Sequence, residues 1–470
     1  MKLTKKILKG YSKNQLIDII LTQQESLQSQ QKIIEAQGRR IQELEERIAR
    51  LEKNSKTSSK PPSSDENKPK RNQSLREKSG RKPGGQKGHK GHHRGQEKEP
   101  DEIKKCLPDS QCKNCGSELD FSDSKVTEKR QEIEIPPIKP HVTEYQKVEV
   151  KCSCGTCNTG QFPEHVKSSL QLGQQLKSFL IYLNVAQLIP FKRLTEMMKD
   201  LFSVSICKRS IENSLEQAAT KAMPVYKQIM SIIKSQKWVG SDETGKRVEG
   251  KRWWEWVWQT EVASYYAIDQ SRGYQVVKEH FGEDYTGTLC HDCWSAHNNT
   301  VAESGHQQCH PHIQRDLQFL ITAYNSLWAY RLNEFLSAAQ KARDIIWKEG
   351  FDADLRDLII QRYNSKLQTF LVKDGANDDI GRIQKRIIKH EKAILHFMSD
   401  PDIPFHNNGS ERAIRMAKVK QKISGGFRSK RGAQRHSILL SIIETAKKQN
   451  MNILEAIQKV LNQSLVFKGG

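Results

Sequence analysis

The segment Lys237-Trp-Val-Gly-Ser-Asp242 is short and largely apolar, and it has the pattern of a buried strand that ends in a carboxylate. After it, Arg252-Trp-Trp-Glu-Trp-Val-Trp-Gln-Thr260 alternates with period two. A third strand is expected at Val262–Asp269, a helix near Gln275–Phe281, and a fourth strand at Thr288-Leu-Cys-His-Asp292. The segment therefore opens an α/β domain whose first and fourth strands both end in aspartate.

Three tryptophans of the second strand, Trp254, Trp256 and Trp258, would share one face of this sheet. Packing in the core is the expected role for such residues. Stacking on splayed nucleic-acid bases is the alternative.

The two aspartates suggest phosphodiester chemistry. Such reactions use two Mg²⁺ ions about 4 Å apart, and Mg²⁺ prefers oxygen ligands. If the first and fourth strands are neighbours, Asp242 and Asp292 meet at one edge of the sheet. Together with a third carboxylate they could hold the metal and catalyse the reaction.

A helix beginning within Phe405-His-Asn-Asn-Gly-Ser-Glu411-Arg-Ala-Ile-Arg-Met416 can supply this third carboxylate, Glu411. Asn408 followed three residues later by Glu411 also matches a helix-capping pattern, so a capping role is the alternative. Basic residues on and after the same helix favour a place where metal and DNA phosphates meet: Arg412, Arg415, Lys418, Lys420 and Lys422.

Length and charge set wider limits. A chain of 470 residues can hold two or three domains, and its formal net charge of +22 indicates a polyanionic partner. The sequence has no run of about 18 apolar residues and no signal-peptide core, so a membrane partner is not expected. We expect a cytoplasmic, nucleoid-associated bacterial setting in which the ten cysteines are thiols.

The N-terminal region, residues 1–55, has a coiled-coil pattern. Apolar residues recur every seven positions, and the alternating seam position holds three glutamines and then two leucines: Ile20, Leu27, Ile34, Ile41 and Ile48, with Gln23, Gln30, Gln37, Leu44 and Leu51. A single amphipathic helix packed on the body of the protein is the alternative. Residues 56–100 form a basic, disordered linker or arm in which Arg81, Lys82 and Lys87 would contact DNA.

Residues 101–162 are expected to form a small zinc-binding module. Its proposed ligands are Cys112, Cys115, Cys154 and Cys157, with Cys152 or Cys106 as substitutes. Unliganded thiols are the alternative. A second apparent set comprises Cys290, Cys293, Cys309, His310 and His312. Cys290 and Cys293 suit ordinary small buried residues, whereas Cys309-x₂-His312 could bind a metal or orient the active site; none is assigned to zinc.

Residues 163–235 are helical in pattern. Pro190–Phe202 followed by Lys208–Leu215 resembles a helix-turn-helix that would present Lys208, Arg209 and Asn213 to DNA. A plain helical bundle explains the same pattern equally well. A second, mainly helical stretch extends from about residue 312 to residue 400 and is broken at Pro401.

The order and wording of several motifs resemble the IS66 family of bacterial insertion-sequence transposases. The matching stretches are Ser58-Ser-Lys-Pro-Pro-Ser-Ser-Asp65, Arg81-Lys-Pro-Gly-Gly-Gln-Lys-Gly-His89, Asp242-Glu-Thr244, His306-Gln-Gln-Cys-His-Pro-His312, Asn407-Asn-Gly-Ser-Glu-Arg-Ala-Ile-Arg415 and Lys420-Gln-Lys-Ile-Ser-Gly-Gly-Phe-Arg-Ser429. The resemblance implies a multi-domain α+β protein. It would contain a coiled coil, a zinc module and an RNase H-like DDE catalytic domain at 236–450, with a helical insertion at about 312–400, and a C-terminal helix and tail at 451–470.

The resemblance further implies that Asp242, Asp292 and Glu411 are the catalytic set. The cofactors would be Mg²⁺ or Mn²⁺ for catalysis and Zn²⁺ for structure. The partners would be double-stranded DNA (transposon ends and target), a second copy of the chain or a higher oligomer, and accessory transposition proteins. Two other functions fit the same residues: a catalytically degenerate zinc-containing DNA-binding protein, and an RNase H-like junction nuclease.

Overall fold

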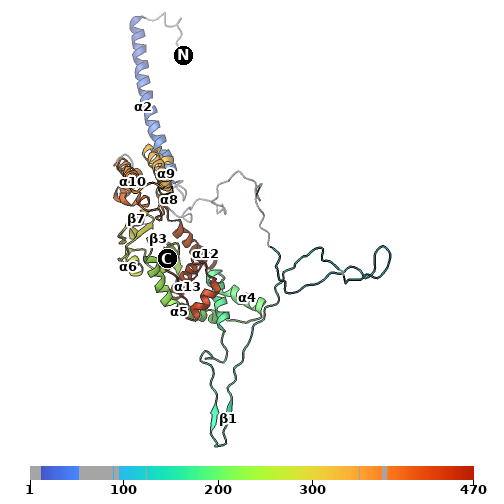
Figure 1. The fold of residues 1–470 in the computed structure, drawn as a ribbon. Coiled ribbons are helices and arrows are strands. Elements are labelled where there is room, and N and C mark those ends of the chain that lie inside the picture. The colour runs from blue at the N-terminus through green and yellow to red at the C-terminus, as the bar shows by residue number, and fades with distance from the viewer. Residues whose placement is uncertain are drawn as a thin grey trace. The chain divides into compact units, whose positions relative to one another are not determined.

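The computed structural model describes residues 12–51, 88, 95–122, 124–348, 350–372 and 378–469 (Figure 1). The chain divides into two compact units. The first comprises Met1–Asn67, Tyr145–Glu196 and Ile206–Gly470, and the second comprises Lys68–Glu144 and Met197–Ser205. Helices and a mixed sheet occur together, which is consistent with the predicted multi-domain α+β fold.

The centre of the first unit is a five-stranded sheet with the order β5-β4-β3-β6-β7. Strands β3 (Trp238–Val248), β4 (Lys251–Gln259) and β5 (Ser264–Asp269) are antiparallel neighbours. Strands β6 (Thr288–His291) and β7 (Gly305–Gln308) continue the sheet in parallel with β3. The four expected strands are therefore present. The fifth, β7, was not predicted, because its four residues are polar and too few to show a period.

The turn between β3 and β4 has a clear local cause. Glu249 and Gly250 connect paired residues Val248 and Lys251, and both have positive φ, of 52° and 75°. A two-residue hairpin with two positive φ angles matches the right-handed twist of its strands. Gly250 adopts this conformation without steric cost.

Helices cover the sheet. α5 (Lys208–Lys234) and α13 (Lys430–Lys448) pack on β5, and α12 (Asn408–Ser424) packs on β3 and β4. Side chains of α13 accept hydrogen bonds from the backbone of the edge strand β5. Tyr266 N donates to Ser441 Oγ at 2.8 Å, and Ser264 N donates to Thr445 Oγ1 at 3.1 Å. Shorter helices complete this region: α3 (Gln174–Ile181), the π-helix η2 (Tyr182–Ala186), α6 (Tyr274–His280), α7 (Ser295–Asn298) and α14 (Ile453–Leu461).

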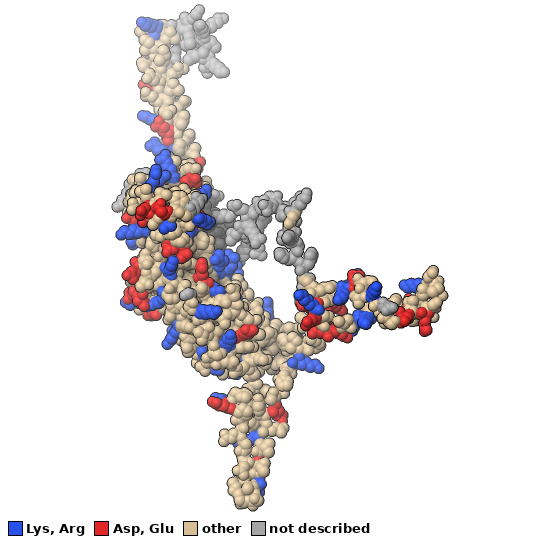
Figure 2. Space-filling view, viewed as in Figure 1, with Lys and Arg blue, Asp and Glu red and all other residues tan. Residues whose placement is uncertain are grey.

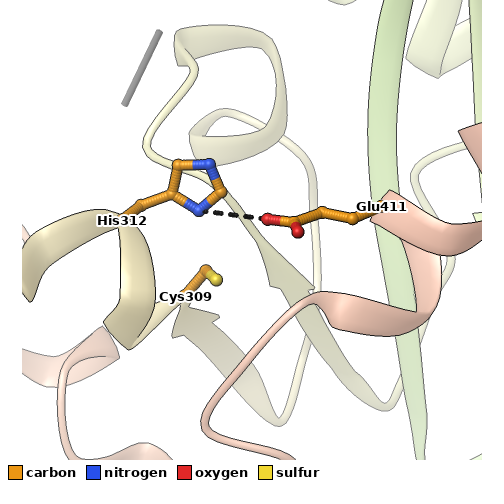
Figure 3. Close-up of side chains that lie close together, drawn as sticks. All are labelled: Cys309, His312 and Glu411. Carbon is orange, nitrogen blue, oxygen red and sulfur yellow. Dashed lines mark ion pairs between the residues drawn. The ribbon is translucent and has the colours of Figure 1, made fainter. Parts of the chain in front are cut away.

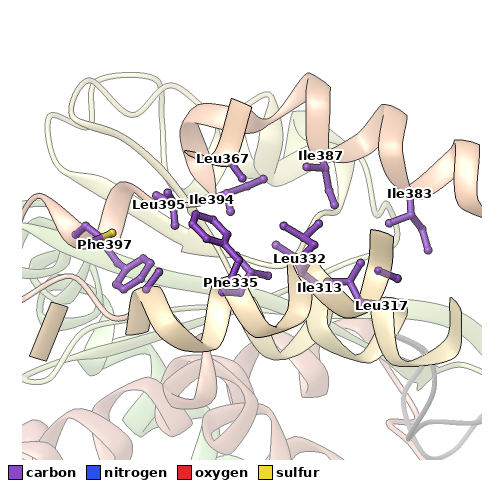
Figure 4. Packing of buried hydrophobic residues seen from close by; sticks show 14 of the residues in the cluster. Ile313, Leu317, Leu332, Phe335, Leu367, Ile383, Ile387, Ile394, Leu395 and Phe397 are labelled. Atoms are coloured by element: carbon purple, nitrogen blue, oxygen red, sulfur yellow. The ribbon is translucent and has the colours of Figure 1, made fainter. Parts of the chain in front are cut away.

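A helical region follows β7 and has its own apolar core (Figure 4). It consists of α8 (His310–Tyr324), α9 (Leu327–Lys348), α10 (Ala353–Gln368) and α11 (Asp378–Lys389), then the 3₁₀ turns η3 (Glu391–Ala393) and η4 (His396–Met398). Leu317, Leu332, Phe335 and Phe397 are buried at its centre. Cys290 of β6 belongs to the same cluster, so this region and the sheet share a core.

The remaining described parts are simpler. α2 (Lys13–Leu51) is one uninterrupted helix of 39 residues, as the heptad pattern predicts. α4 (Phe191–Phe202) precedes α5, and the short strands β1 (Glu149–Lys151) and β2 (Cys157–Thr159) form a hairpin. None of the helices in the described ranges is long and apolar enough to cross a membrane.

A buried ion pair joins β3 to β4. Lys246 Nζ of β3 lies 3.1 Å from Glu255 Oε2 of β4, and each side chain is only 1% exposed. Lys246 also donates to the carbonyl of Ala417 in α12, and Ser437 Oγ of α13 lies 3.4 Å from Glu255 Oε1. The pair therefore connects the sheet to two covering helices. Removing one partner of such a pair leaves an uncompensated charge in the core.

We expect Lys246→Met to lower the free energy of unfolding by about 3–5 kcal/mol, because Glu255 is then buried without its cation. In the double variant Lys246→Met, Glu255→Gln no charge remains, and most of this loss should be recovered. Thermal and urea unfolding of the wild type and of both variants measure the difference. A double variant as unstable as the single one would contradict the interpretation.

Candidate active site

Two parallel strands bring Asp242 and Asp292 together. Gly240 of β3 pairs with Cys290 of β6, and each aspartate follows its paired residue by two positions. Side chains two residues apart in a strand point to the same face, so both carboxylates lie at one edge of the sheet. Trp294 N donates to Asp292 Oδ1 at 3.0 Å, and Glu243 N donates to Asp242 Oδ1 at 2.8 Å. The condition that these two strands are neighbours is therefore met.

Asp242 is buried in the neighbourhood of other acidic side chains. Burial raises the pKa of Asp242 well above its usual value, and the nearby negative charges of Asp292, Glu243 and Glu411 raise it further. The hydrogen bond from Glu243 N opposes this shift. Several carboxylates therefore gather around a buried one, and this arrangement becomes favourable when a cation lies among them.

A close contact between α12 and β3 positions Glu411. Asn407 precedes α12, and its Nδ2 donates to the carbonyl of Ser241 at 2.8 Å. A Cβ on Gly240 would lie 2.6 Å from Ser410 Oγ and 2.8 Å from Asn407 Oδ1, so only glycine allows this approach. The start of α12 is thus fixed against the strand that carries Asp242.

The capping alternative for Glu411 is wrong in its details. The N-cap residue is Asn407 rather than Asn408, and it makes no side-chain capping hydrogen bond. The carboxylate of Glu411 instead faces α8: His312 Nδ1 lies 3.8 Å and Arg315 Nη2 lies 3.5 Å from Glu411 Oε1. Figure 3 shows His312 directed at Glu411, with Cys309 beside them.

A buried network lies behind Asp242. Glu243 Oε2 is 2.8 Å from His297 Nε2, and Glu243 Oε1 accepts a hydrogen bond of 2.7 Å from Arg272 Nε. Burial alone would raise the pKa of Glu243, but His297 and Arg272 outweigh it and the pKa is lowered. Ser241 Oγ completes the chain at 3.2 Å from His297 Nδ1. The network fixes both residues that flank Asp242.

Sequence reasoning missed the roles of Glu243, Arg272 and His297. Glu243 stood in the motif quoted for Asp242, and His297 lies five positions after Asp292, so their closeness to these residues in the sequence was the available signal. Their pairing joins β3 to α7, and nothing in the spacing of the sequence indicates that contact. Arg272 comes from the loop before α6 and had no signal at all.

The tryptophans of β4 divide into two groups. Trp256 and Trp258 are fully buried and stack on one another with centroids 6.0 Å apart, so their core role is confirmed. Trp254 is half-buried, and the Arg272 guanidinium lies between its ring and that of Trp294, at 4.5 and 3.5 Å from the centroids. This stack holds Arg272, and therefore Glu243, beside the loop that carries Asp292.

These carboxylates lie inside a stretch with known relatives. The profile described as "Transposase IS66 family" matches residues 169–435, which include Asp242, Asp292 and Glu411. The chain belongs to the IS66 transposase family. Residues 13–95 match a second profile, a family of unknown function called DUF6444.

A curated relative is also similar to part of the chain. It is the "Uncharacterized protein y4jO" of Sinorhizobium fredii (strain NBRC 101917 / NGR234), which is 32% identical over 152 residues. The match covers 29% of this chain and 47% of that protein, so the chain spans about half the length of this relative.

The basic residues of α12 differ in exposure. Arg412, Arg415 and Lys422 are exposed, and Figure 2 shows Lys and Arg side chains over the face of the body that includes this helix. Lys418 is half-buried, and the influence of Asp242 on its pKa places it near the site. Lys420 is buried, and burial together with Lys246 lowers its pKa to about 8. The side chain of Lys420 therefore lacks the exposure that the predicted contact with DNA requires.

The structure describes only some of the other residues that were predicted to contact DNA. Lys208 and Arg209 are exposed in the first turn of α5, and Arg209 Nη1 pairs with Glu212 Oε2 at 3.1 Å. α5 continues for 27 residues as a core helix of the first unit. Arg81, Lys82 and Lys87 lie outside the described residues.

Tight turns contain Cys112 and Cys115 of the first predicted zinc-binding pair and Cys154 of the second. Gly116 N donates to the carbonyl of Cys112 at 2.8 Å, and Gly155 N donates in the same way to Cys152 at 2.8 Å. Both glycines have positive φ, 74° and 92°. Hydrogen bonds from Ser117 lower the pKa of Cys115 to about 7, and hydrogen bonds from Thr156 do the same for Cys154. Cys152 also lies beside Cys154, whereas Cys157 begins β2.

Of the two cysteines around Asp292, Cys290 is buried, as expected, whereas Cys293 is half-buried. Cys290 is buried in the shared core, and burial raises its pKa well above its usual value. Burial also raises the pKa of Cys293 to about 12.

Replacing Asp242 by asparagine should stabilise the metal-free protein at neutral pH. Because the pKa of Asp242 is higher in the folded than in the unfolded chain, its favourable contribution is complete below the unfolded value of about 4 and is lost as the pH rises towards the folded value. Asparagine does not ionise, so its advantage should be larger at pH 7.5 than at pH 5. Melting temperatures in chelator test this, and a variant that is less stable at both pH values would contradict it.

Proposed function

We propose that this chain is a DDE-type DNA transposase in which Asp242, Asp292 and Glu411 catalyse Mg²⁺-dependent cleavage and strand transfer at transposon ends. The observation that carries the proposal is the convergence of three carboxylates, from β3, β6 and α12, within the stretch matched by the transposase profile. The mixed sheet, with antiparallel strands followed by parallel ones, supports an RNase H-like catalytic domain interrupted by helices α8–α11.

The donor chemistry of these residues fits Mg²⁺ or Mn²⁺. All three supply carboxylate oxygens, and the raised pKa of Asp242 is what crowded carboxylates show without a cation. Two such ions, when bound, activate the attacking oxygen and stabilise the leaving oxygen of a phosphodiester.

Other residues of the chain orient these carboxylates. The N–H of Trp294 holds the Asp292 carboxylate, and Asn407 holds the start of α12 against β3. The exposed cations Arg412, Arg415 and Lys422 on the same helix suit the phosphates of double-stranded DNA, in both the transposon end and the target. The order of events is water attack, followed by attack of the freed 3′-hydroxyl on target DNA.

Labelled DNA carrying the ends of the element should be nicked and joined with Mg²⁺ and remain intact with chelator. Asp242→Asn and Glu411→Gln should each lose activity by about a thousandfold or more, because the metal ligands act as one unit. Glu303→Gln is the matched control, since Glu303 is an exposed carboxylate on the same domain.

The same assay separates the competing functions. Cleavage of branched DNA without preference for the ends would replace the transposase proposal with a junction nuclease. End binding without Mg²⁺-dependent cleavage would leave a DNA-binding protein. Retained cleavage by Glu411→Gln would remove Glu411 from the metal ligands.

We further propose that α2 pairs with a second copy of the chain in a parallel, in-register coiled coil. Ile20, Leu27, Ile34, Ile41 and Ile48 of the seam are each 53–65% exposed in the single chain. In a parallel pair every seam glutamine meets its own counterpart, and the two amides can hydrogen-bond. In an antiparallel pair each glutamine would face an apolar residue instead, which leaves a buried amide without a partner.

Charges next to the seam favour the same orientation. In a parallel pair, Arg40 of one helix lies beside Glu45 of the other, and Arg47 beside Glu52, a residue outside the described range. These pairs form twice by symmetry. Each contributes only a few tenths of a kcal/mol, but an antiparallel arrangement has none of them.

Ile34→Cys should form a disulfide between two copies under mild oxidation, because equivalent seam residues face each other only in a parallel, in-register pair. Lys32→Cys, on the outer face of the same helix, should not. Both variants are compared with the wild type on non-reducing gels, since the chain has ten cysteines of its own. A dimer in ultracentrifugation without the Ile34→Cys crosslink would exclude the parallel register, and a monomer would exclude pairing.

Finally, we propose that Cys112, Cys115, Cys154 and Cys157 bind a structural Zn²⁺ ion in a module that grips DNA ends. The low thiol pKa values of Cys115 and Cys154 favour the thiolates that zinc requires. The turn around Gly155 supports Cys152 as the alternative donor in the second pair.

A further inference from the structure

Cys309, His312 and Glu411 form a compact group of three different donors (Figure 3). Their sulfur, imidazole nitrogen and carboxylate oxygen all lie within 4.8 Å of one another. Cys309 is the N-cap residue of α8, His312 lies in the first turn of α8, and Glu411 lies in the first turn of α12. The Cys-x-x-His spacing across a helix start therefore places two donors opposite a third from another helix.

This donor set suits a different metal from the carboxylate site. Zn²⁺ binds cysteine sulfur, histidine nitrogen and carboxylate oxygen in tetrahedral sites, and three protein ligands leave one position for water. Mg²⁺ takes oxygen ligands and is a poor match for a thiolate and an imidazole.

Burial raises the pKa of the Cys309 thiol to about 12, but two local features oppose this shift and favour a metal-bound thiolate. The backbone N–H of Asn407 donates to Cys309 Sγ at 3.2 Å, and the position of Cys309 at the start of α8 places the positive end of the helix dipole beside it. Cys309 is 1% exposed, whereas the side chain of Glu411 is 40% exposed. The group is therefore closed on the cysteine side and open to solvent on the glutamate side, which gives an ion a path of entry.

We propose that Cys309, His312 and Glu411 bind Zn²⁺ and that this ion competes with catalytic Mg²⁺ for Glu411. Binding releases the thiol proton of Cys309 to solvent. The carboxylate of Glu411 then points at zinc and away from the pair formed by Asp242 and Asp292. Zinc binding does not depend on the proposed transposase function, but the inhibition that follows from it does.

Arg315 is the existing competitor for the same carboxylate. Its Nη2 lies 3.5 Å from Glu411 Oε1, and its side chain is 28% exposed. A zinc ion must displace this cation or share the carboxylate with it. Arg315→Ala should therefore bind zinc more tightly, whereas a purely structural role for the cluster predicts no gain in metal affinity.

The binding test uses Co²⁺ and Zn²⁺ as probes on the full chain. Cys309→Ala and His312→Ala should each bind one equivalent fewer than the wild type, with weaker sulfur-to-cobalt charge-transfer absorption. Cys293→Ala should match the wild type, because Cys293 is a neighbouring cysteine outside the donor group. Melting temperatures without metal verify that the variants fold. Equal metal content in the wild type and both ligand variants would overturn the site.

The competition test adds micromolar Zn²⁺ to DNA cleavage in millimolar Mg²⁺, with each variant normalised to its own activity in Mg²⁺ alone. Wild type should be inhibited, and Cys309→Ala should need at least about tenfold more zinc, which corresponds to about 1.4 kcal/mol of lost affinity. If wild type binds the extra zinc but is not inhibited, the competition is wrong. If no Mg²⁺-dependent cleavage occurs, the proposed function fails while the binding result stands.

Discussion

The parallel pairing of β3 with β6 is the constraint on which the rest of the site depends. It sets Asp242 and Asp292 at one edge of the sheet, and Gly240 in the same register leaves room for the start of α12. A shift of the pairing by one residue would turn one aspartate to the opposite face. A larger residue in place of Gly240 would clash with the side chains of Gln259, Ser410 and Asn407, two of which lie at the start of α12. One short strand contact therefore determines whether three carboxylates converge.

The polar interior of the sheet supports this register. Lys246 and Glu255 join β3 to β4, and Glu243 joins β3 to α7 through His297. Buried polar groups of this kind are costly unless every partner is in place, so they penalise alternative registers more than they add stability. Both networks begin on the strand that carries Asp242. The buried polar contacts thus fix the strand register most strongly on β3, the strand that carries Asp242.

Local sequence patterns predicted the helices and strands, but they did not predict which distant segments contact one another. A short apolar run located β3, period-two alternation located β4, and heptads located α2, because all these signals come from neighbouring residues. The pairing of β3 with β6 could be stated only as a condition, because Trp238 of β3 and its partner Thr288 of β6 are 50 positions apart in the chain. The contacts of Glu243 and Glu411 depend on loops and helix starts that arrive from distant segments. Burial likewise separated Lys420 from the exposed cations of α12, a distinction that charge patterning alone does not make.

Glu411 is the least constrained of the three carboxylates. Asp242 is surrounded by fixed groups and Asp292 accepts a backbone hydrogen bond, whereas Glu411 is 40% exposed and faces His312 and Arg315 on α8. A partly exposed carboxylate can turn towards a cation with little rearrangement of the backbone. In the proposed mechanism Glu411 would complete the metal site in this way, and a competing ion could capture it in the same way. The weak constraint on the Glu411 side chain therefore underlies both the proposed catalysis and its proposed inhibition by zinc.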